Sequence, residues 1–245
     1  KKQGGAYCSG YTPDIKPYVM LNHLGKPRDV STMAHELGHA IHDMFASKQS
    51  LLNYHPILPL AETASVFSEM IVTDLLLEEV TDNDTKQQIL TEKLEDIFAT
   101  SHRQNMFSCF EQVVHAKVMD KLPSVDDYCQ AYHAQLKTMF ADSVVIPDEY
   151  KWEWSTIPHF INVPFYVYAY NFGNLLVMAL YQQYKEEGVS FIPKLKELLS
   201  AGSVTDPVTI TQIVGVDIES SAFWQKSIVY IESLIDELDV LLAST

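Results

Sequence analysis

The spacing of the apolar residues constrains this chain more than any other feature of its sequence. Between residues 30 and 45, apolar side chains recur every three or four positions, which is the period of one face of an α-helix. Strand signals are confined to the start of the chain, where residues 17–22 form a short aromatic and β-branched run. The same helical spacing predicts further helices near residues 60–80, 85–120, 126–140, 164–186, 191–200 and 221–243. We therefore expect one mainly α-helical domain over residues 1–245, with a small β-sheet near the N-terminus.

The charge and hydropathy of the chain exclude some classes of partner. The 245 residues include 32 acidic and 17 basic ones, giving a formal net charge of −15, and no cluster of lysine or arginine occurs. Because nucleic-acid-binding proteins carry a basic patch, we expect no nucleic-acid partner. No apolar run reaches the roughly 18 residues of a membrane span, so we expect no membrane association.

The cysteines favour a reducing compartment. Cys8, Cys109 and Cys129 are odd in number and widely spaced, which is not the pattern of a disulfide framework. No apolar segment follows Lys1 and Lys2, so the N-terminus has no feature of a signal peptide. Since disulfides are rare in the cytosol, these features predict a cytoplasmic protein.

The first predicted helix carries the sequence H-E-x-x-H, formed by His35, Glu36 and His39, with Asp29 or Ser31 as its expected N-cap. Residues four apart share one face of a helix, so both imidazoles can reach the same metal ion. In such sites a glutamate takes the proton of a zinc-activated water, which then attacks a peptide carbonyl. The motif therefore predicts a zinc centre with Glu36 as the general base.

A catalytic zinc ion needs a third protein ligand, and the next predicted helix offers Glu62. Glu69 follows on the same helix face, where it could hydrogen-bond a histidine that binds zinc. Either glutamate could instead face solvent, as most glutamates do. The apolar neighbours of Glu62 favour a ligand, whereas the two interpretations of Glu69 stay open.

The metzincin class of zinc peptidases is excluded by two positions. That class requires glycine three residues after the second histidine and a ligand three residues further on. This chain has His42 and Phe45 there. His42 is therefore expected either to contact a metal ligand without binding the metal itself or to be partly exposed.

Several further segments have the sequence of a known family, in the expected order. They are residues 4–7, 17–22, 34–40, 60–65, 191–193, 198–202, 215–218 and 223–224. With these segments the chain resembles the M3 peptidases, and within them the oligoendopeptidase F branch. The resemblance implies a zincin-like helical catalytic domain with one Zn²⁺ per chain, bound by His35, His39 and Glu62. It also implies a zinc-dependent endopeptidase whose substrates are peptides.

A second catalytic element is implied within residues 157–170. The resemblance places here the histidine and tyrosines that bind the substrate and polarise its scissile carbonyl, which correspond to His159, Tyr166 and Tyr170. A phenol hydroxyl can donate a hydrogen bond to the oxyanion formed on attack. A helix starting at Pro164 would put Tyr166 and Tyr170 on one face, while the alignment also leaves Tyr168 as an alternative.

The length of the chain leaves alternatives to this function. M3 peptidases are more than twice as long, and their N-terminal half forms the opposite wall of a deep substrate channel. The resemblance therefore implies that this half is absent from the chain and would act as its partner. The first alternative is a non-catalytic fragment or split subunit that binds zinc and peptide but needs that half. Others are a helical interaction protein with an accidental motif, and a different zinc peptidase such as a carboxypeptidase.

Overall fold

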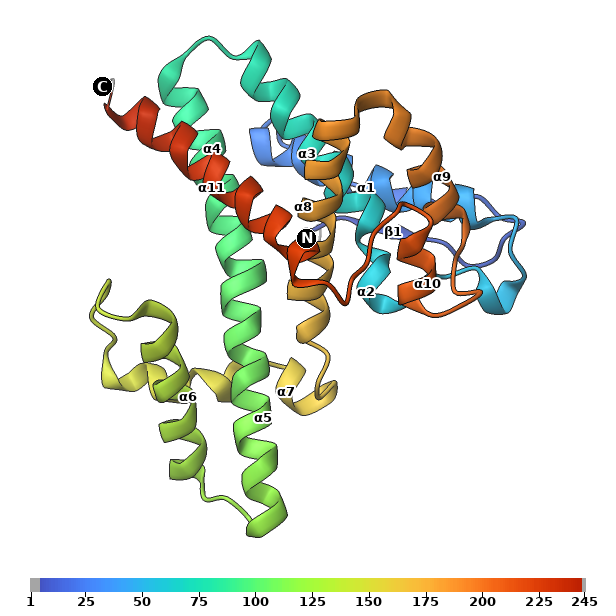
Figure 1. Ribbon diagram of the computed structural model, residues 1–245. Helices are drawn as coiled ribbons and strands as arrows, with labels where there is room; N and C mark the ends of the chain where they lie inside the picture. Colours follow the sequence, from blue (N-terminus) through green and yellow to red (C-terminus); the bar gives the residue numbers. More distant parts are fainter. Residues whose placement is uncertain (1–4, 244–245) are drawn as a thin grey trace. The chain divides into compact units, whose positions relative to one another are not determined.

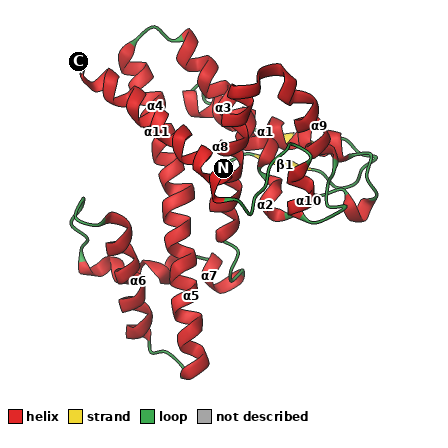
Figure 2. Ribbon diagram, viewed as in Figure 1, coloured by secondary structure: helices red, strands yellow, loops and turns green. Residues whose placement is uncertain are grey.

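The computed structural model describes residues 5–243, and helices make up most of it (Figures 1 and 2). The helices are α1 (Pro27–Ala46), α2 (Leu58–Ala61), α3 (Thr63–Glu79), α4 (Asn83–Ile97), α5 (Gln104–Asp120), α6 (Val125–Phe140), α7 (His159–Asn162), α8 (Tyr168–Glu187), α9 (Ile192–Ser200), α10 (Pro207–Gln212) and α11 (Ser221–Ala243). Short 3-10 helices are η1 (Leu51–Asn53), η3 (Asp148–Thr156) and η4 (Gly188–Phe191), and η2 (Phe98–Arg103) is π-helical. No helix in the described part of the chain is long and apolar enough to cross a membrane.

The small sheet has two antiparallel strands, β1 (Tyr7–Ser9) and β2 (Tyr18–Met20), with Cys8 opposite Val19. The prediction of a mainly α-helical fold with a small N-terminal sheet is confirmed. Gly4, which belongs to the first segment of the family resemblance, lies outside the described residues.

The chain divides into two compact units. The first comprises Lys1–Leu94 and Gly173–Thr245, and it contains the sheet, α1, α2 and α3 together with α9, α10 and α11. The second comprises Glu95–Phe172 and contains α5, α6, η3 and α7. That both units form one domain stays a prediction.

The contact between α1 and α3 in the first unit depends on Gly38. A Cβ atom at this position would lie 2.5 Å from Cα of Ser65 and 2.6 Å from the carbonyl oxygen of Ala64. Only glycine permits such an approach of two backbones. The close contact brings the residues of α1 that flank Gly38 next to the N-terminal end of α3.

The N-terminus of α1 differs from the expectation. The N-cap is Lys26, with proline at the first helical position, where its fixed φ suits a helix start. Asp29 lies inside the first turn, and its Oδ2 accepts hydrogen bonds from the backbone N–H groups of Leu24 (2.7 Å) and Lys26 (2.9 Å). The prediction of Asp29 or Ser31 as the N-cap was wrong, because the proline starts the helix earlier.

In the second unit, α5 and α6 lie side by side and bury an aromatic core (Figure 1). Phe107, Phe110 and Tyr132 are at most 4% exposed, and Phe110 meets Tyr132 edge to face with ring centroids 5.2 Å apart. Aromatic pairs of this geometry stabilise a core beyond their buried area. After α6 comes η3, whose Glu153 accepts a hydrogen bond from the hydroxyl of Tyr132.

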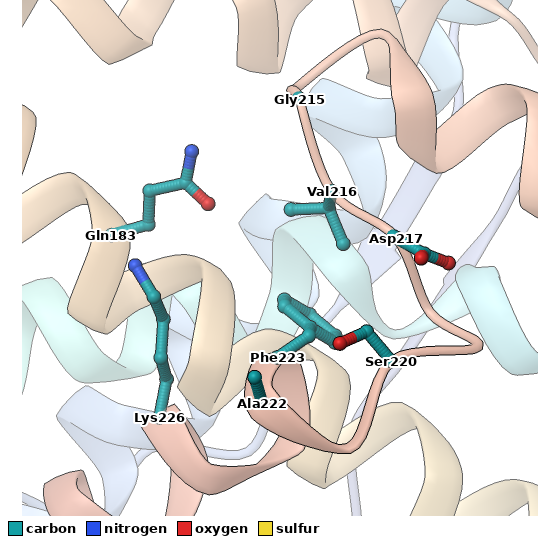
Figure 3. A pocket seen from close by; sticks show the side chains of 8 residues that line it. All are labelled: Gln183, Gly215, Val216, Asp217, Ser220, Ala222, Phe223 and Lys226. Carbon is teal, nitrogen blue, oxygen red and sulfur yellow. The ribbon is translucent and has the colours of Figure 1, made fainter.

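A hollow in the first unit is lined by residues of α8, of α11 and of the loop that precedes α11 (Figure 3). Its side chains include Gln183, Val216 and Lys226. None of the predicted site residues lines it. The hollow therefore has no part in the predicted chemistry.

Candidate metal centre and histidine–tyrosine cluster

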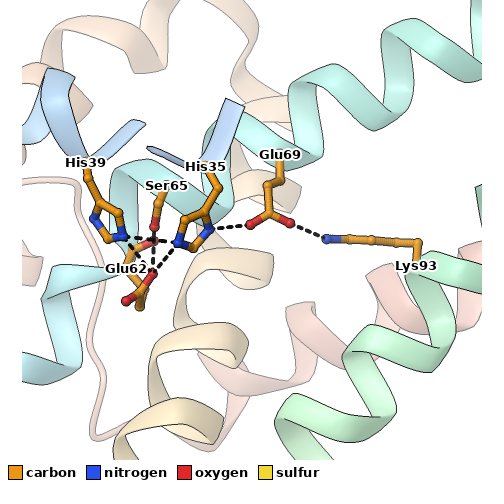
Figure 4. Close-up of polar contacts among 6 residues, drawn as sticks. All are labelled: His35, His39, Glu62, Ser65, Glu69 and Lys93. Carbon is orange, nitrogen blue, oxygen red and sulfur yellow. Dashed lines mark hydrogen bonds and ion pairs between the residues drawn. The ribbon is translucent and has the colours of Figure 1, made fainter. Parts of the chain in front are cut away.

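The side chains of His35, His39 and Glu62 converge in the first unit (Figure 4). Nε2 of His35 and Nε2 of His39 are 3.1 Å apart, and Oε2 of Glu62 lies 3.5 Å from the first and 3.4 Å from the second. Among the residues whose side chains the structure describes, these three form the one group of His, Cys, Asp or Glu whose donor atoms could hold a metal ion. The side chains are 24–35% exposed, so solvent can reach the cluster.

The donor set fits zinc. Nitrogen and oxygen ligands at the usual distances from a tetrahedral zinc ion are about 3.3 Å from one another. The three distances between the donor atoms here are 3.1, 3.4 and 3.5 Å. Two imidazoles and one carboxylate are also a ligand set typical of catalytic zinc, in which the fourth position stays open for water. Little rearrangement is therefore needed to bind the ion.

Glu62, which lies near the two histidines, stands at a break in the helix. It lies between α2 and α3 with φ −84° and ψ 2°, so the prediction of one continuous helix over residues 60–80 was wrong here. The hydroxyl of Thr63 donates to the carbonyl oxygen of Leu60 (2.8 Å), which satisfies a backbone group at the break. The hydroxyl of Ser65 donates to Oε2 of Glu62 (2.7 Å). The break and this hydrogen bond together orient the carboxylate.

Glu69 orients His35 from the other side of its ring. Oε1 of Glu69 is 2.5 Å from Nδ1 of His35, and Oε2 is 3.6 Å from Nζ of Lys93 (Figure 4). Burial alone would lower the pKa of His35, but the hydrogen bond and the charge of Glu69 outweigh it and raise that pKa. Burial would likewise raise the pKa of Glu69, yet the bond from His35 and the charge of Lys93 lower it. Of the two interpretations of Glu69, the structure favours a partner of His35 over a solvent-facing residue.

Glu36 and His42 are both buried, with exposures of 8% and 3%. Burial and the charge of His39 lower the pKa of His42 to about 4, against a hydrogen bond to the backbone of Ala61 that raises it. His42 is thus a neutral ring fixed to the residue just before Glu62. Of the two expectations for His42, partial exposure is excluded.

A histidine–tyrosine cluster lies wholly within the second unit and consists of His159, Tyr166 and Tyr170. Nε2 of His159 is 3.2 Å from the hydroxyl of Tyr170, and the ring centroids of Tyr166 and Tyr170 are 5.3 Å apart. Tyr168 is 49% exposed. The three predicted side chains are therefore brought together, with hydroxyl groups and a ring nitrogen that can donate hydrogen bonds.

The cluster arises in a different way from the one expected. The helix predicted to start at Pro164 starts at Tyr168, because Phe165 has a φ of 62° in the left-handed region. The backbone N–H of Phe165 donates to Oε1 of Glu111 (2.8 Å), a side chain in a residue only 2% exposed. Residues 163–167 thus form a turn held by a buried carboxylate. No sequence signal near this turn indicated Glu111, because it lies far away on α5.

A helix bearing H-E-x-x-H, with a glutamate from a later segment as the third candidate ligand, is an arrangement typical of zinc peptidases. The sequence model of Peptidase family M3 matches residues 1–230 of this chain. The chain belongs to this family, and the resemblance to its oligoendopeptidase F branch is confirmed.

Individual relatives agree with this assignment. Oligopeptidase PepF of Bacillus subtilis is 32% identical over 98% of this chain and 36% of its own length. The chromosomal oligoendopeptidase F of Lactococcus lactis subsp. cremoris is 30% identical over 98% of this chain and 40% of its own length. Oligoendopeptidase F of Enterococcus faecium is structurally similar, with a TM-score of 0.75 and 26% identity over 90% of this chain and 42% of that one. The chain spans about two fifths of the length of these relatives.

Proposed function

We propose that this chain is the catalytic part of a zinc-dependent metalloendopeptidase that binds one Zn²⁺ and hydrolyses internal bonds of oligopeptides. The observation that carries the proposal is the triangle of donor atoms from His35, His39 and Glu62, whose edges match a zinc site. Membership of Peptidase family M3 and the names of the relatives, oligopeptidase and oligoendopeptidase, support a peptide substrate. We propose the cytoplasm as the compartment, which the three free thiols support.

In the proposed mechanism, the residues of the first unit hold the ion and move the proton. A bound zinc ion supplies a Lewis acid that acidifies water and polarises a carbonyl. Nδ1–H of His35 donates to Glu69, so Nε2 of His35 keeps its lone pair for the metal. Glu36 takes a proton from the attacking water and delivers it to the leaving amine. Its burial limits competition from bulk water for that proton.

His159, Tyr166 and Tyr170 are proposed to bind the substrate. Each of them can donate a hydrogen bond to the carbonyl oxygen as it gains negative charge. The contact between His159 and the hydroxyl of Tyr170 supports these two residues as a pair. The exposure of Tyr168, and the contacts of Tyr166 with both other rings, favour Tyr166 over Tyr168.

The first test compares metal content with turnover. Wild type should contain close to one zinc per chain by elemental analysis, and His35→Ala should contain none. Glu36→Gln should keep the metal, while kcat on internally quenched peptides falls by roughly 100- to 10,000-fold, the usual contribution of a general base. Peptides blocked at both ends should still be cleaved, which a carboxypeptidase could not do. Wild type that binds no zinc after reconstitution would rule out the proposal.

A second candidate is a subunit that needs the remainder of the family's sequence for activity. One observation favours it: Met33, Leu37, Ile41 and Met44 form an apolar stripe on α1 and are 37–57% exposed. The relatives also have about three fifths of their length outside the matched region. The test is to add a separately produced polypeptide that covers the unmatched part of a relative. Zinc binding without turnover, followed by turnover on mixing, would favour this candidate.

A further inference from the structure

The ion pair between Glu69 and Lys93 indicates a role beyond those assigned so far. We propose that Lys93 is a positioning residue for the metal centre, which acts through Glu69 on His35. The inference rests on the proposed function, because it concerns the same metal ion. It adds a residue to the centre that touches neither the donor atoms nor the substrate.

The burial of Lys93 is the first observation. Its side chain, on α4, is only 8% exposed, whereas lysine is rarely buried unless it is paired. Burying an ammonium group is costly unless an opposite charge compensates it. Nζ of Lys93 faces Oε2 of Glu69 at 3.6 Å, and the Glu69 side chain is itself 15% exposed. Burying both charges has a desolvation cost, which two apolar side chains at the same positions would avoid.

The division of the two oxygen atoms of Glu69 is the second observation. Oε1 contacts Nδ1 of His35 at 2.5 Å, and Oε2 contacts Nζ of Lys93 (Figure 4). The carboxylate is thus held at both ends and cannot turn away from the imidazole without giving up an ion pair. The consequence is a fixed ring orientation for His35, with Nδ1 toward Glu69 and Nε2 toward the donor cluster.

Removal of Lys93 should therefore weaken metal binding without removing any ligand. In Lys93→Met, Oε2 of Glu69 loses its partner, and the His35 ring is oriented less tightly. Residues hydrogen-bonded to ligands typically change metal affinity by about 10- to 100-fold. Lys93 is one contact further away, so we expect a loss of roughly 10-fold in zinc affinity, at the low end of that range.

The experiment measures the zinc dissociation constant of the chain by competition with a chromophoric chelator. The variants are Lys93→Met, which keeps the length and apolar stem of the side chain, and Lys93→Gln, which keeps a donor but not the charge. Lys86→Met is the matched control, because it removes the same charge from the same helix at a partly exposed position. Thermal unfolding of the metal-free proteins shows that each variant is folded.

The double variant Lys93→Met with Glu69→Gln separates positioning from a general loss of structure. If Lys93 acts through Glu69, Lys93→Met should have little further effect once Glu69 is neutral, so the two losses are not additive. Additive losses, or an affinity of Lys93→Met equal to that of Lys86→Met, would overturn the inference. If wild type binds zinc and Lys93→Met binds it equally tightly, this inference alone is overturned. Absence of zinc from wild type overturns the proposed function as well.

Discussion

At the scale of single residues, two of the three proposed metal ligands, His35 and Glu62, are each held by a neighbouring side chain. Ser65 holds the carboxylate of Glu62, and Glu69 holds the ring of His35. Supporting hydrogen bonds of this kind reduce the ordering that metal binding must impose. The proposed donor atoms therefore already lie close to the geometry that a zinc ion would require.

The sequence predicts the ligands better than their supports. The prediction of His35 and His39 follows from their spacing within one helix. The prediction of Glu62 follows from its apolar neighbours on the next predicted helix and from the family resemblance. The roles of Lys93 and Glu111 could not be predicted, because each residue meets its partner only through a tertiary contact. A lysine or glutamate in a helix is normally exposed, and nothing local in the sequence shows that these two are buried.

His42 makes the stability of the metal-free protein depend on pH. Its pKa falls from 6.5 to about 4 on folding, so the unfolded chain binds more protons between these values. The contribution of His42 to the free energy of unfolding is complete above pH 6.5 and is lost as pH falls through about 4. The free energy of unfolding should therefore drop by roughly 3 kcal/mol over this range.

Denaturant unfolding at several pH values checks this expectation. His42→Gln carries no titratable ring and should flatten the pH dependence, whereas the same change at the exposed His23 should leave it as in wild type. Equal slopes for wild type and His42→Gln would contradict the expectation.

At the scale of elements, the period of the apolar residues predicts the helices well but not the places where they stop. The segment over residues 221–243 is helical as expected, because its apolar period is long and uninterrupted. The apolar period does not indicate the break at Glu62 or the turn at Phe165. The first is stabilised by the contacts of α3, and the second by a carboxylate from α5. The contact at Phe165 is tertiary and is absent from a linear pattern, whereas the one at Glu62 joins residues only three positions apart.

The contact of α1 with α3 should be very sensitive to Gly38→Ala. The added methyl group meets backbone atoms at 2.5 and 2.6 Å, so the helices must separate. We expect a loss of about 1–3 kcal/mol in stability, typical of overpacking, together with weaker zinc binding. Gly173→Ala should cost less stability, because the nearest atom to its added methyl group is the carbonyl oxygen of Pro59, at 3.3 Å. Urea unfolding and zinc titration of both variants measure the effects, and an equal cost for the two changes would argue against a specific α1–α3 contact.

At the scale of the whole molecule, the assignment of all three proposed ligands to one unit predicts a local response to the metal. A ligand that binds only the folded state stabilises the structure that binds it. Zinc should therefore slow amide hydrogen exchange in α1 and at the start of α3, with little change in α5 and α6. Mass spectrometry of the zinc-loaded and chelator-treated protein measures this. Equal changes in both units would show that the ion stabilises the chain as a single cooperative body.

The proposed donor atoms all come from residues 35 to 62, a short stretch of one chain. The entropy lost on closing a loop grows with its length, so this loop is cheap to close. A metal ion bound there would join α1 to α3 early in folding, before residues 173–245 complete the first unit. Refolding in the presence of zinc would then begin from two helices joined by the ion. During synthesis the proposed ligands would also leave the ribosome before residues 173–245 of the first unit, so the site could assemble first.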